Sequence, residues 1–120
     1  MRQVITSEHL ADANGLPAGG TTVGLGIEIR WQAGPLPHPD RLTRDPVAVM
    51  AEDVGANGAF VEGVIQAAID RIGWYQVVSG GRFACDENAM AVRSLELAID
   101  TLDSRTRQRA ARGVLGTHKV

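Results

Sequence analysis

Apolar side chains recur every three or four positions in two stretches of the C-terminal half of the chain. This spacing places them along one side of an α-helix, so both stretches are predicted to be amphipathic helices. The first is expected from about Gly58, with Asn57 as its N-cap, to the Gly-rich segment 79–82, and the second from about Asp86 to Arg112. The predicted stripes are Val61, Val64, Ile65, Ala68, Ile69, Ile72 and Tyr75 in the first helix, and Val92, Leu95, Ile99, Leu102 and Thr106 in the second.

The short Gly-rich connection between these stretches predicts that the two helices pack as an antiparallel hairpin. Asp86 and Glu87 lie where the second helix begins, and acidic residues stabilise that positive end. The last two turns of the same helix have only Ala110 and Ala111 as apolar cover, before Gly113 is expected to end it. A helix end of this kind needs a ligand or a partner subunit to hold it, and we therefore expect a homo-oligomer.

In the N-terminal half, apolar residues recur at every second position instead. Between Thr21 and Trp31, apolar residues alternate with Gly, Glu and Arg, which predicts one strand that buries a single face. Upstream, residues 2–6 are expected to form a short strand, and residues 6–15 a turn of helix that begins at a capping hydroxyl. The residues on the predicted buried face of the strand are Val23, Leu25, Ile27, Ile29 and Trp31.

Residues 32–46 contain four prolines and are predicted to form a loop, and the apolar residues 47–50 could add one strand at an edge of the sheet. The predicted fold is therefore α+β, with a small antiparallel N-terminal sheet packed with a C-terminal antiparallel α-helical hairpin. We expect a single domain over residues 1–120, in which a β-rich part (1–56) precedes the hairpin and the C-terminal tail (57–120).

The composition excludes several classes of protein. A net charge of −2 does not favour binding to DNA, RNA or a membrane surface. No apolar run approaches the roughly 20 residues of a membrane-spanning helix, and the N-terminal residues are too polar for a signal peptide. The single cysteine permits no intrachain disulfide, which favours a cytoplasmic protein.

The charge is nevertheless distributed unevenly. All 14 acidic residues lie at or before Asp103, together with seven of the 12 basic residues, whereas residues 104–120 hold five basic residues and no acidic one. Such a separation within a small chain is typical of a local anion site. A solvated basic helix end, which the helix dipole favours, remains the alternative interpretation.

Residues suited to catalysis do not gather in the sequence. His9, His38 and His118 lack the spacing of metal ligands, with one another or with Cys85. Cys85 and a distant His are a nominal nucleophile pair, but the apolar neighbours of Cys85 favour a small buried thiol. The Gly-rich segment 15–26 lacks the Lys-Ser/Thr of a phosphate-binding P-loop and leads into a strand. We therefore expect no catalytic residue, no metal site and no cofactor.

Residues suited to binding anions are better represented. Arg105, Arg109 and Arg112 lie at i, i+4 and i+7 on one face of the second helix, whereas Arg107 points elsewhere. Guanidinium groups and backbone N–H groups are the usual partners of phosphate, and Gly113, Gly116 and Thr117 follow directly in the sequence.

A nucleobase needs an aromatic face and amide groups. Phe83 lies in the connection before the second helix and could supply the face, and Asn88 could bind a base edge. Phe83 could instead be a hydrophobic staple of that helix, which is the commoner role of such a residue.

Four segments of the chain resemble the phage-encoded Thoeris anti-defence proteins. They are GIEIRWQAGPL (26–36), NGAFVEGVIQAAIDRIGWYQ (57–76), FACDENAMAV (83–92) and RTRQRAARGVLGTHKV (105–120). The resemblance covers roughly residues 20–35 and 57–120, and its most specific part is the pattern R-x-x-R-G-V-x-G-T-H from Arg109 to His118. Residues 36–56 form a longer stretch than the family usually has.

This resemblance implies a binding protein rather than an enzyme. Proteins of the family are nucleotide sponges that share a helical hairpin with the phage anti-CBASS sponges. They sequester cyclic ADP-ribose isomers made by bacterial TIR-domain proteins, and members can hold cyclic di- or trinucleotides at a second site. Their protomers form dimers that can assemble into hexamers, with the signals bound at subunit interfaces in the cytoplasm of the infected bacterial cell.

By the same resemblance, the adenine of the signal is expected against Phe83 and Asn88. The pyrophosphate is expected at the basic end of the second helix, with a contribution from the sheet. The implied nucleotide-binding residues are Arg30, Trp31, Phe83, Asn88, Arg105, Arg109, Arg112, Gly116, Thr117 and His118. Two other functions stay open at this point: a small nucleotide hydrolase, and a phage structural or nucleic-acid-associated oligomer that uses the basic tail.

Overall fold

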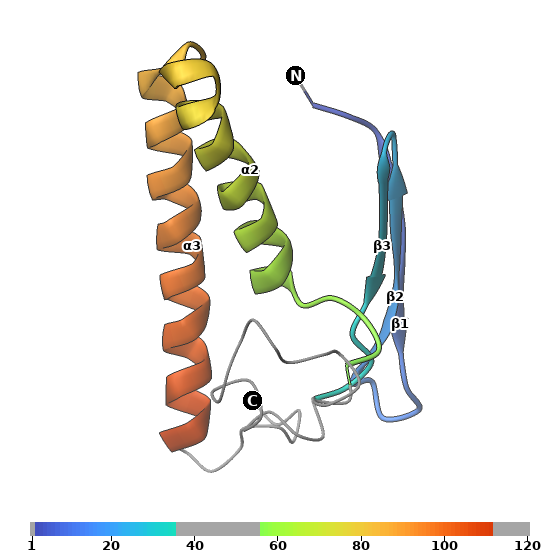
Figure 1. Cartoon of the computed structure of the whole chain (residues 1–120). Helices are drawn as coiled ribbons and strands as arrows, with labels where there is room; N and C mark the ends of the chain where they lie inside the picture. The colour runs from blue at the N-terminus through green and yellow to red at the C-terminus, as the bar shows by residue number, and fades with distance from the viewer. Residues whose placement is uncertain (1, 36–55, 112–120) are drawn as a thin grey trace. The chain divides into compact units, whose positions relative to one another are not determined.

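The computed structural model of the chain describes residues 2–35 and 56–111 (Figure 1). These residues fall into two compact units, one that contains the N-terminal strands up to Phe60 and one that begins at Val61 and contains the helices. The first unit is a three-stranded antiparallel sheet, and the second is a pair of packed helices. The prediction of an α+β protein with an N-terminal sheet and a C-terminal hairpin is confirmed.

The sheet consists of β1 (Ile5–Ala11), β2 (Pro17–Gly24) and β3 (Ile27–Trp31), in the order β1-β2-β3. Asp12 closes the turn between β1 and β2, because its Oδ1 accepts hydrogen bonds from the backbone N of Asn14 (2.8 Å) and of Leu16 (3.0 Å). Gly15 completes this turn with a φ of 78°, a left-handed conformation that glycine adopts without steric cost. Each neighbouring pair of strands is thus a β-hairpin.

The prediction of one continuous strand from Thr21 to Trp31 is wrong. The chain reverses at Leu25 and Gly26, where Gly26 has a φ of 72°, and Gly24 pairs with Ile27. The reversal changes the face on which the earlier residues lie, because directly paired residues share a face. Ile27, Ile29 and Trp31 share one face, as predicted, whereas Val23 lies on the opposite face and Leu25 is 83% exposed in the turn.

The turn of helix predicted for residues 6–15 is also wrong, because Ile5 to Ala11 form β1 and pair with β2. Ser7, one of the two predicted capping residues, forms a hydrogen bond between neighbouring strands instead. Ser7 Oγ lies 2.8 Å from Thr22 Oγ1, which also accepts a hydrogen bond from Nε1 of Trp31 (2.9 Å). The side chain of Thr22 is buried between them. Cross-strand pairing therefore outweighs the local helix signal.

The segment before the helices is held to the end of β3. Ala59 forms a parallel bridge with Trp31, and the Asn57 side chain pairs with the backbone of Ala33 through Oδ1 (2.8 Å) and Nδ2 (3.4 Å). Oε1 of the buried Gln32 accepts hydrogen bonds from the backbone N of Asn57 and of Gly58. Asn57 is therefore not the predicted N-cap, because its amide group is used to fix this crossing and the helix begins later, at Val61.

Gly58 lies closest to β3 where residues 57–59 cross the end of that strand, so a substitution at Gly58 tests this crossing. A Cβ added at Gly58 would meet the carbonyl group of Trp31 and the backbone N of Gln32. We expect Gly58→Ala to lower the free energy of unfolding by about 1–3 kcal/mol, because the backbones must separate. Gly63→Ala is the matched control, since a Cβ there meets nothing within 4 Å and alanine favours a helix. Urea unfolding measures both variants, and equal stabilities would contradict the described crossing.

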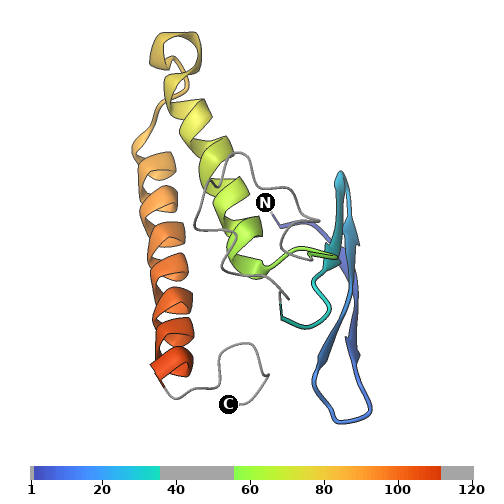
Figure 2. The same cartoon turned by 60° about the horizontal axis from the view of Figure 1, so that its bottom comes forward.

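The second unit consists of α2 (Val61–Gly81) and α3 (Asp86–Ala111), which run side by side in opposite directions in Figures 1 and 2. The antiparallel hairpin is thus confirmed. Regular helical geometry in α2 ends before Val78, because Val78, Ser79 and Gly80 have non-helical backbone angles. This agrees with the predicted break in the segment 79–82. The acidic pair Asp86 and Glu87 lies in the first turn of α3, as predicted.

The predicted stripes are only partly covered, and Val61 at the start of the first stripe is 50% exposed. Val64, Ile65 and Ile72 of α2, and Val92, Leu95, Ile99 and Leu102 of α3, are half-buried, whereas Tyr75 and Thr106 are exposed. No residue of α2 is buried. In residues 2–35 and 56–108 only Thr22 and Gln32 are buried, and large apolar side chains are exposed, among them Val77 (69%), Leu97 (66%), Met90 (59%) and Trp74 (47%). The hairpin therefore presents apolar surface that its own unit does not cover.

Candidate functional site

Phe83 and Asn88 come together at the turn between α2 and α3. Asn88 lies in the first turn of α3, and its Nδ2 donates hydrogen bonds to Oε1 of Gln76 (3.1 Å) and to the backbone O of Phe83 (3.4 Å). Phe83 is 55% exposed, so its side chain is accessible to a ligand. The two residues predicted for the base end of the site are thus neighbours in the fold.

A hollow of about 490 Å³ lies beside this pair. It combines aromatic rings, a hydroxyl group and an amide group, which are the groups that stack on a nucleobase and bind its edge. The non-helical backbone at Val78, Ser79 and Gly80 interrupts α2 at this point, shortly before the chain continues to α3. The residues that line the hollow are Trp74, Tyr75, Val78, Ser79, Phe83 and Asn88.

Two arginines lie against the aromatic rings at this end of the hairpin. The guanidinium carbon of Arg71 is 4.6 Å from the ring centre of Trp74 and 5.2 Å from that of Tyr75, and Arg71 Nε donates to the Tyr75 hydroxyl (3.3 Å). The guanidinium carbon of Arg82 is 5.4 Å from the ring centre of Phe83. Such cation–π contacts hold a positive charge next to exposed aromatic faces.

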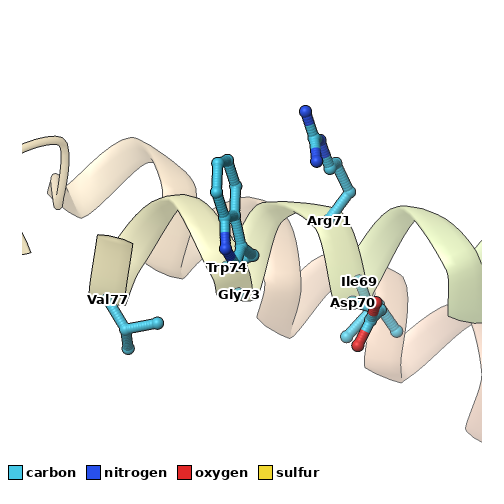
Figure 3. Close-up of a pocket in the computed structure, with 6 residues that line it drawn as sticks. All are labelled: Ile69, Asp70, Arg71, Gly73, Trp74 and Val77. Carbon is cyan, nitrogen blue, oxygen red and sulfur yellow. The ribbon is translucent and has the colours of Figure 1, made fainter. Parts of the chain in front are cut away.

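Figure 3 shows that Arg71 and Trp74 project from the same side of α2, whereas Asp70 and Val77 project away from it. Together with Ile69 and Gly73, these residues line a second hollow, of about 570 Å³. The sequence interpretation did not identify Arg71, Trp74 or Tyr75 as site residues. Their spacing at i, i+3 and i+4 on one helix is the signal that could have revealed them.

The basic residues of the predicted site lie at the other end of α3. Arg105 is exposed, and Arg109 lies in the last turn that the structure describes. Arg112, Gly116, Thr117 and His118 lie outside the described residues. At 1.5 Å per residue, the 21 positions from Asn88 to Arg109 span about 32 Å of helix. One small nucleotide therefore cannot contact both ends of the same α3.

Arg30 and Trp31 belong to the sheet unit, and as consecutive residues of β3 they point to opposite faces. Trp31 is half-buried, and its Nε1 donates to Thr22. Arg30 is exposed and pairs with Thr21 on β2. Beside them, Nε2 of Gln32 is buried and has no hydrogen-bond partner among residues 2–35 and 56–111. The sheet face that carries Trp31 thus differs from the one that carries Arg30.

The prediction of a buried Cys85 thiol is wrong, because Cys85 is exposed at the hairpin turn. Its backbone, rather than its sulfur, has the structural role, since its N and O atoms both bond to Gln76. In the part of the chain that the structure describes, no group of three or more His, Cys, Asp or Glu side chains is placed to hold a metal ion. Neither α2 nor α3 combines the length and apolar character that crossing a membrane requires.

The amino-acid sequence of the chain is similar to that of a known phage protein. No protein-family model matches the chain. A segment of 65 residues, 54% of the chain, is 45% identical to Thoeris anti-defense 1 of Bacillus phage SBSphiJ7. The matched segment spans 44% of that protein, so less than half of its length has a counterpart in the match. Over this segment the chain is a homologue of Thoeris anti-defense 1, which confirms the resemblance predicted from its sequence motifs.

Proposed function

We propose that the chain is a phage anti-defence protein that binds cyclic ADP-ribose isomers and sequesters them without cleaving them. Its homology to Thoeris anti-defense 1 carries this proposal. The hollow at the hairpin turn supports it, because Trp74, Tyr75 and Phe83 offer aromatic faces next to the Asn88 amide. A sponge lowers the free concentration of its ligand by tight binding, for which a Kd on the order of nanomolar corresponds to about 12 kcal/mol.

In this proposal the adenine occupies the hollow at the turn. Its ring stacks on Phe83, whose side chain is more than half exposed, and its edge meets Asn88. Stacking on an aromatic side chain contributes about 1–3 kcal/mol for one base. The remaining affinity must come from the charged pyrophosphate and from exclusion of water, because exposed ion pairs contribute little.

The pyrophosphate is assigned to Arg105, Arg109 and Arg112, with the backbone of Gly116–Thr117–His118. Since about 32 Å of helix separates Arg109 from Asn88, these groups must come from a second copy of the chain. A dimer in which the basic end of one α3 lies beside the hairpin turn of the other would complete the site. Arg30 and Trp31 stay predictions from the resemblance, and because they point to opposite faces of β3, one ligand would contact at most one of them.

Exposed apolar side chains on the hairpin support a homo-oligomer, since a monomer would leave Val77, Leu97 and Met90 in water. We propose a dimer that can assemble further, to a hexamer, and that acts in the cytoplasm of the infected bacterial cell. A second site, for cyclic di- or trinucleotides, is proposed at a subunit interface as well. No cofactor is needed for this function.

A capture-and-release assay tests the proposal directly. The protein is incubated with a cyclic ADP-ribose isomer and passed through a filter that retains protein, and the retained fraction is then heated. Loss of the ligand from the filtrate and its recovery unchanged after heating would support sequestration. Altered products would instead favour a nucleotide hydrolase. Binding to oligonucleotides that falls steeply with salt, without capture of the cyclic ligand, would favour a nucleic-acid-associated protein.

A further inference from the structure

Gln76 joins the two helices across the hairpin turn. Its Oε1 accepts a hydrogen bond from the backbone N of Cys85 (2.9 Å), and its Nε2 donates to the backbone O of the same residue (3.2 Å). A backbone N–H can only donate and a backbone carbonyl can only accept. These two contacts therefore fix which end of the Gln76 amide is oxygen and which is nitrogen.

The Gln76 amide orients the side chain of Asn88, together with the backbone O of Phe83. Oε1 of Gln76 also accepts a hydrogen bond from Nδ2 of Asn88 (3.1 Å), and Nδ2 donates as well to the backbone O of Phe83 (3.4 Å). Both protons of the Asn88 amide are thus directed to protein acceptors. Oδ1 of Asn88 has no hydrogen-bond partner among residues 2–35 and 56–111. Asn88, which lines the hollow, therefore has an acceptor available to a ligand and no free donor.

We propose that Gln76 is a positioning residue that sets the base specificity of the site. By holding Nδ2 of Asn88, it leaves Oδ1 to accept a hydrogen bond from an exocyclic amine, such as N6 of adenine. A base with a carbonyl oxygen at that position, such as hypoxanthine, would place two acceptors against each other and leave both unpaired. This inference rests on the proposed function, because it assumes that a nucleobase occupies the hollow.

The test compares two ligands that differ only in the base edge. One is a cyclic ADP-ribose isomer joined through its sugars, so that the base edge is free, and the other carries hypoxanthine in place of adenine. Isothermal titration of the full chain gives a Kd for each. We expect the Kd of the unsubstituted protein to be roughly tenfold to a hundredfold lower for the adenine compound. This ratio is the one expected when the hypoxanthine compound leaves a polar group unpaired.

Three variants separate positioning from simple stabilisation of the turn. Gln76→Met removes all three contacts of the Gln76 side chain. Asn88 is then held only by the longer contact to the backbone O of Phe83 (3.4 Å), so its amide can turn and the preference should fall to about threefold or less. Gln76→Glu keeps an acceptor for Asn88 but cannot donate to Cys85, so the preference should be retained. A merely structural role would make both variants alike. Gln66→Met on the exposed side of α2 is the matched control and should change neither Kd.

Each outcome is decisive. An unchanged preference in Gln76→Met, or its loss in a folded Gln76→Glu, would overturn the role of Gln76 while leaving capture of the signal intact. If Gln76→Met loses its helical circular dichroism, the preference of Gln76→Glu alone decides the question. Failure of the unsubstituted protein to bind either compound would overturn the proposed function, and this assignment with it.

Discussion

Replacement of Phe83 by Ala is expected to weaken capture of the cyclic ADP-ribose signal by about 10- to 100-fold. The ring is 55% exposed and lines the hollow at the hairpin turn, so its loss removes a stacking surface without opening a core. Stacking of one base contributes about 1–3 kcal/mol, and 1.4 kcal/mol corresponds to a factor of ten in Kd. Titration of the ligand at constant salt measures the change.

The other phenylalanine of the chain supplies the control for this prediction. Phe60 is 39% exposed and lies before α2, outside the hollow. Phe60→Ala removes the same side chain from a different place and should leave the Kd within about twofold, since it touches no proposed contact. Equal losses in the two variants would mean that Phe83 acts on folding rather than on the ligand.

A larger loss, of about 100- to 10,000-fold, is expected when Arg109 and Arg112 are both replaced by Ala. Each is assigned to the pyrophosphate, and a hydrogen bond to a charged group contributes about 1.5–3 kcal/mol. The free energy of unfolding should change little, because the neighbouring basic residues of α3, Arg105 and Arg107, are exposed and contribute to no buried core. The same titration measures the affinity, and circular dichroism checks the helix.

Arg107→Ala is the matched charge control, because it removes a positive charge from the same helix end. Arg107 is exposed, and its position in the helix places it on a different side from Arg105 and Arg109. It should weaken capture by no more than about threefold, through long-range attraction alone. A double variant of Arg109 and Arg112 that captured the ligand at full affinity would overturn the assignment of the pyrophosphate.

The helices were predictable because their signal is local and repeated. The stripe from Val92 to Leu102 follows the helical period over several turns, and the Gly-rich break at 79–82 can only be a turn. The same local rules failed at Asn57. Its side chain could cap a helix, yet it binds Ala33, which is 24 residues away in sequence, and no local pattern reports such a partner.

The sheet was predicted less well because apolar and polar residues continue to alternate through the turn at which the chain reverses. Leu25 continues the apolar alternation from Val23 to Ile27, so a two-residue turn in the middle resembled strand. The residue that indicates a turn here is Gly26, since glycine readily adopts its φ of 72° and is common in tight hairpin turns. In β1, pairing with β2 overrode a sequence that resembles a helix start.

For the candidate site, residue chemistry identified Phe83 and Asn88 but not the groups that orient them. Gln76 is nine residues from Cys85 and twelve from Asn88, and its role appears only when the hairpin closes. Arg71 likewise acquires its place from the rings of Trp74 and Tyr75. Residues whose own side chains suit a ligand can be predicted from the sequence. Residues that orient other side chains can be identified only once the packing of the two helices is known.

Mixing two weakened variants gives the most direct test of a site shared between two copies. At a ligand concentration near the Kd of the unsubstituted protein, Phe83→Ala and Arg109→Ala are each expected to lose most capture, but a mixed dimer would contain one site with both native residues. Random pairing after co-expression should restore about a quarter of the unsubstituted capacity, because half of the dimers are mixed and each has one intact site of two. Equilibrium dialysis with the cyclic ADP-ribose isomer measures this capacity. If the co-expressed variants capture no more ligand than either variant alone, the two ends of α3 do not meet at one ligand.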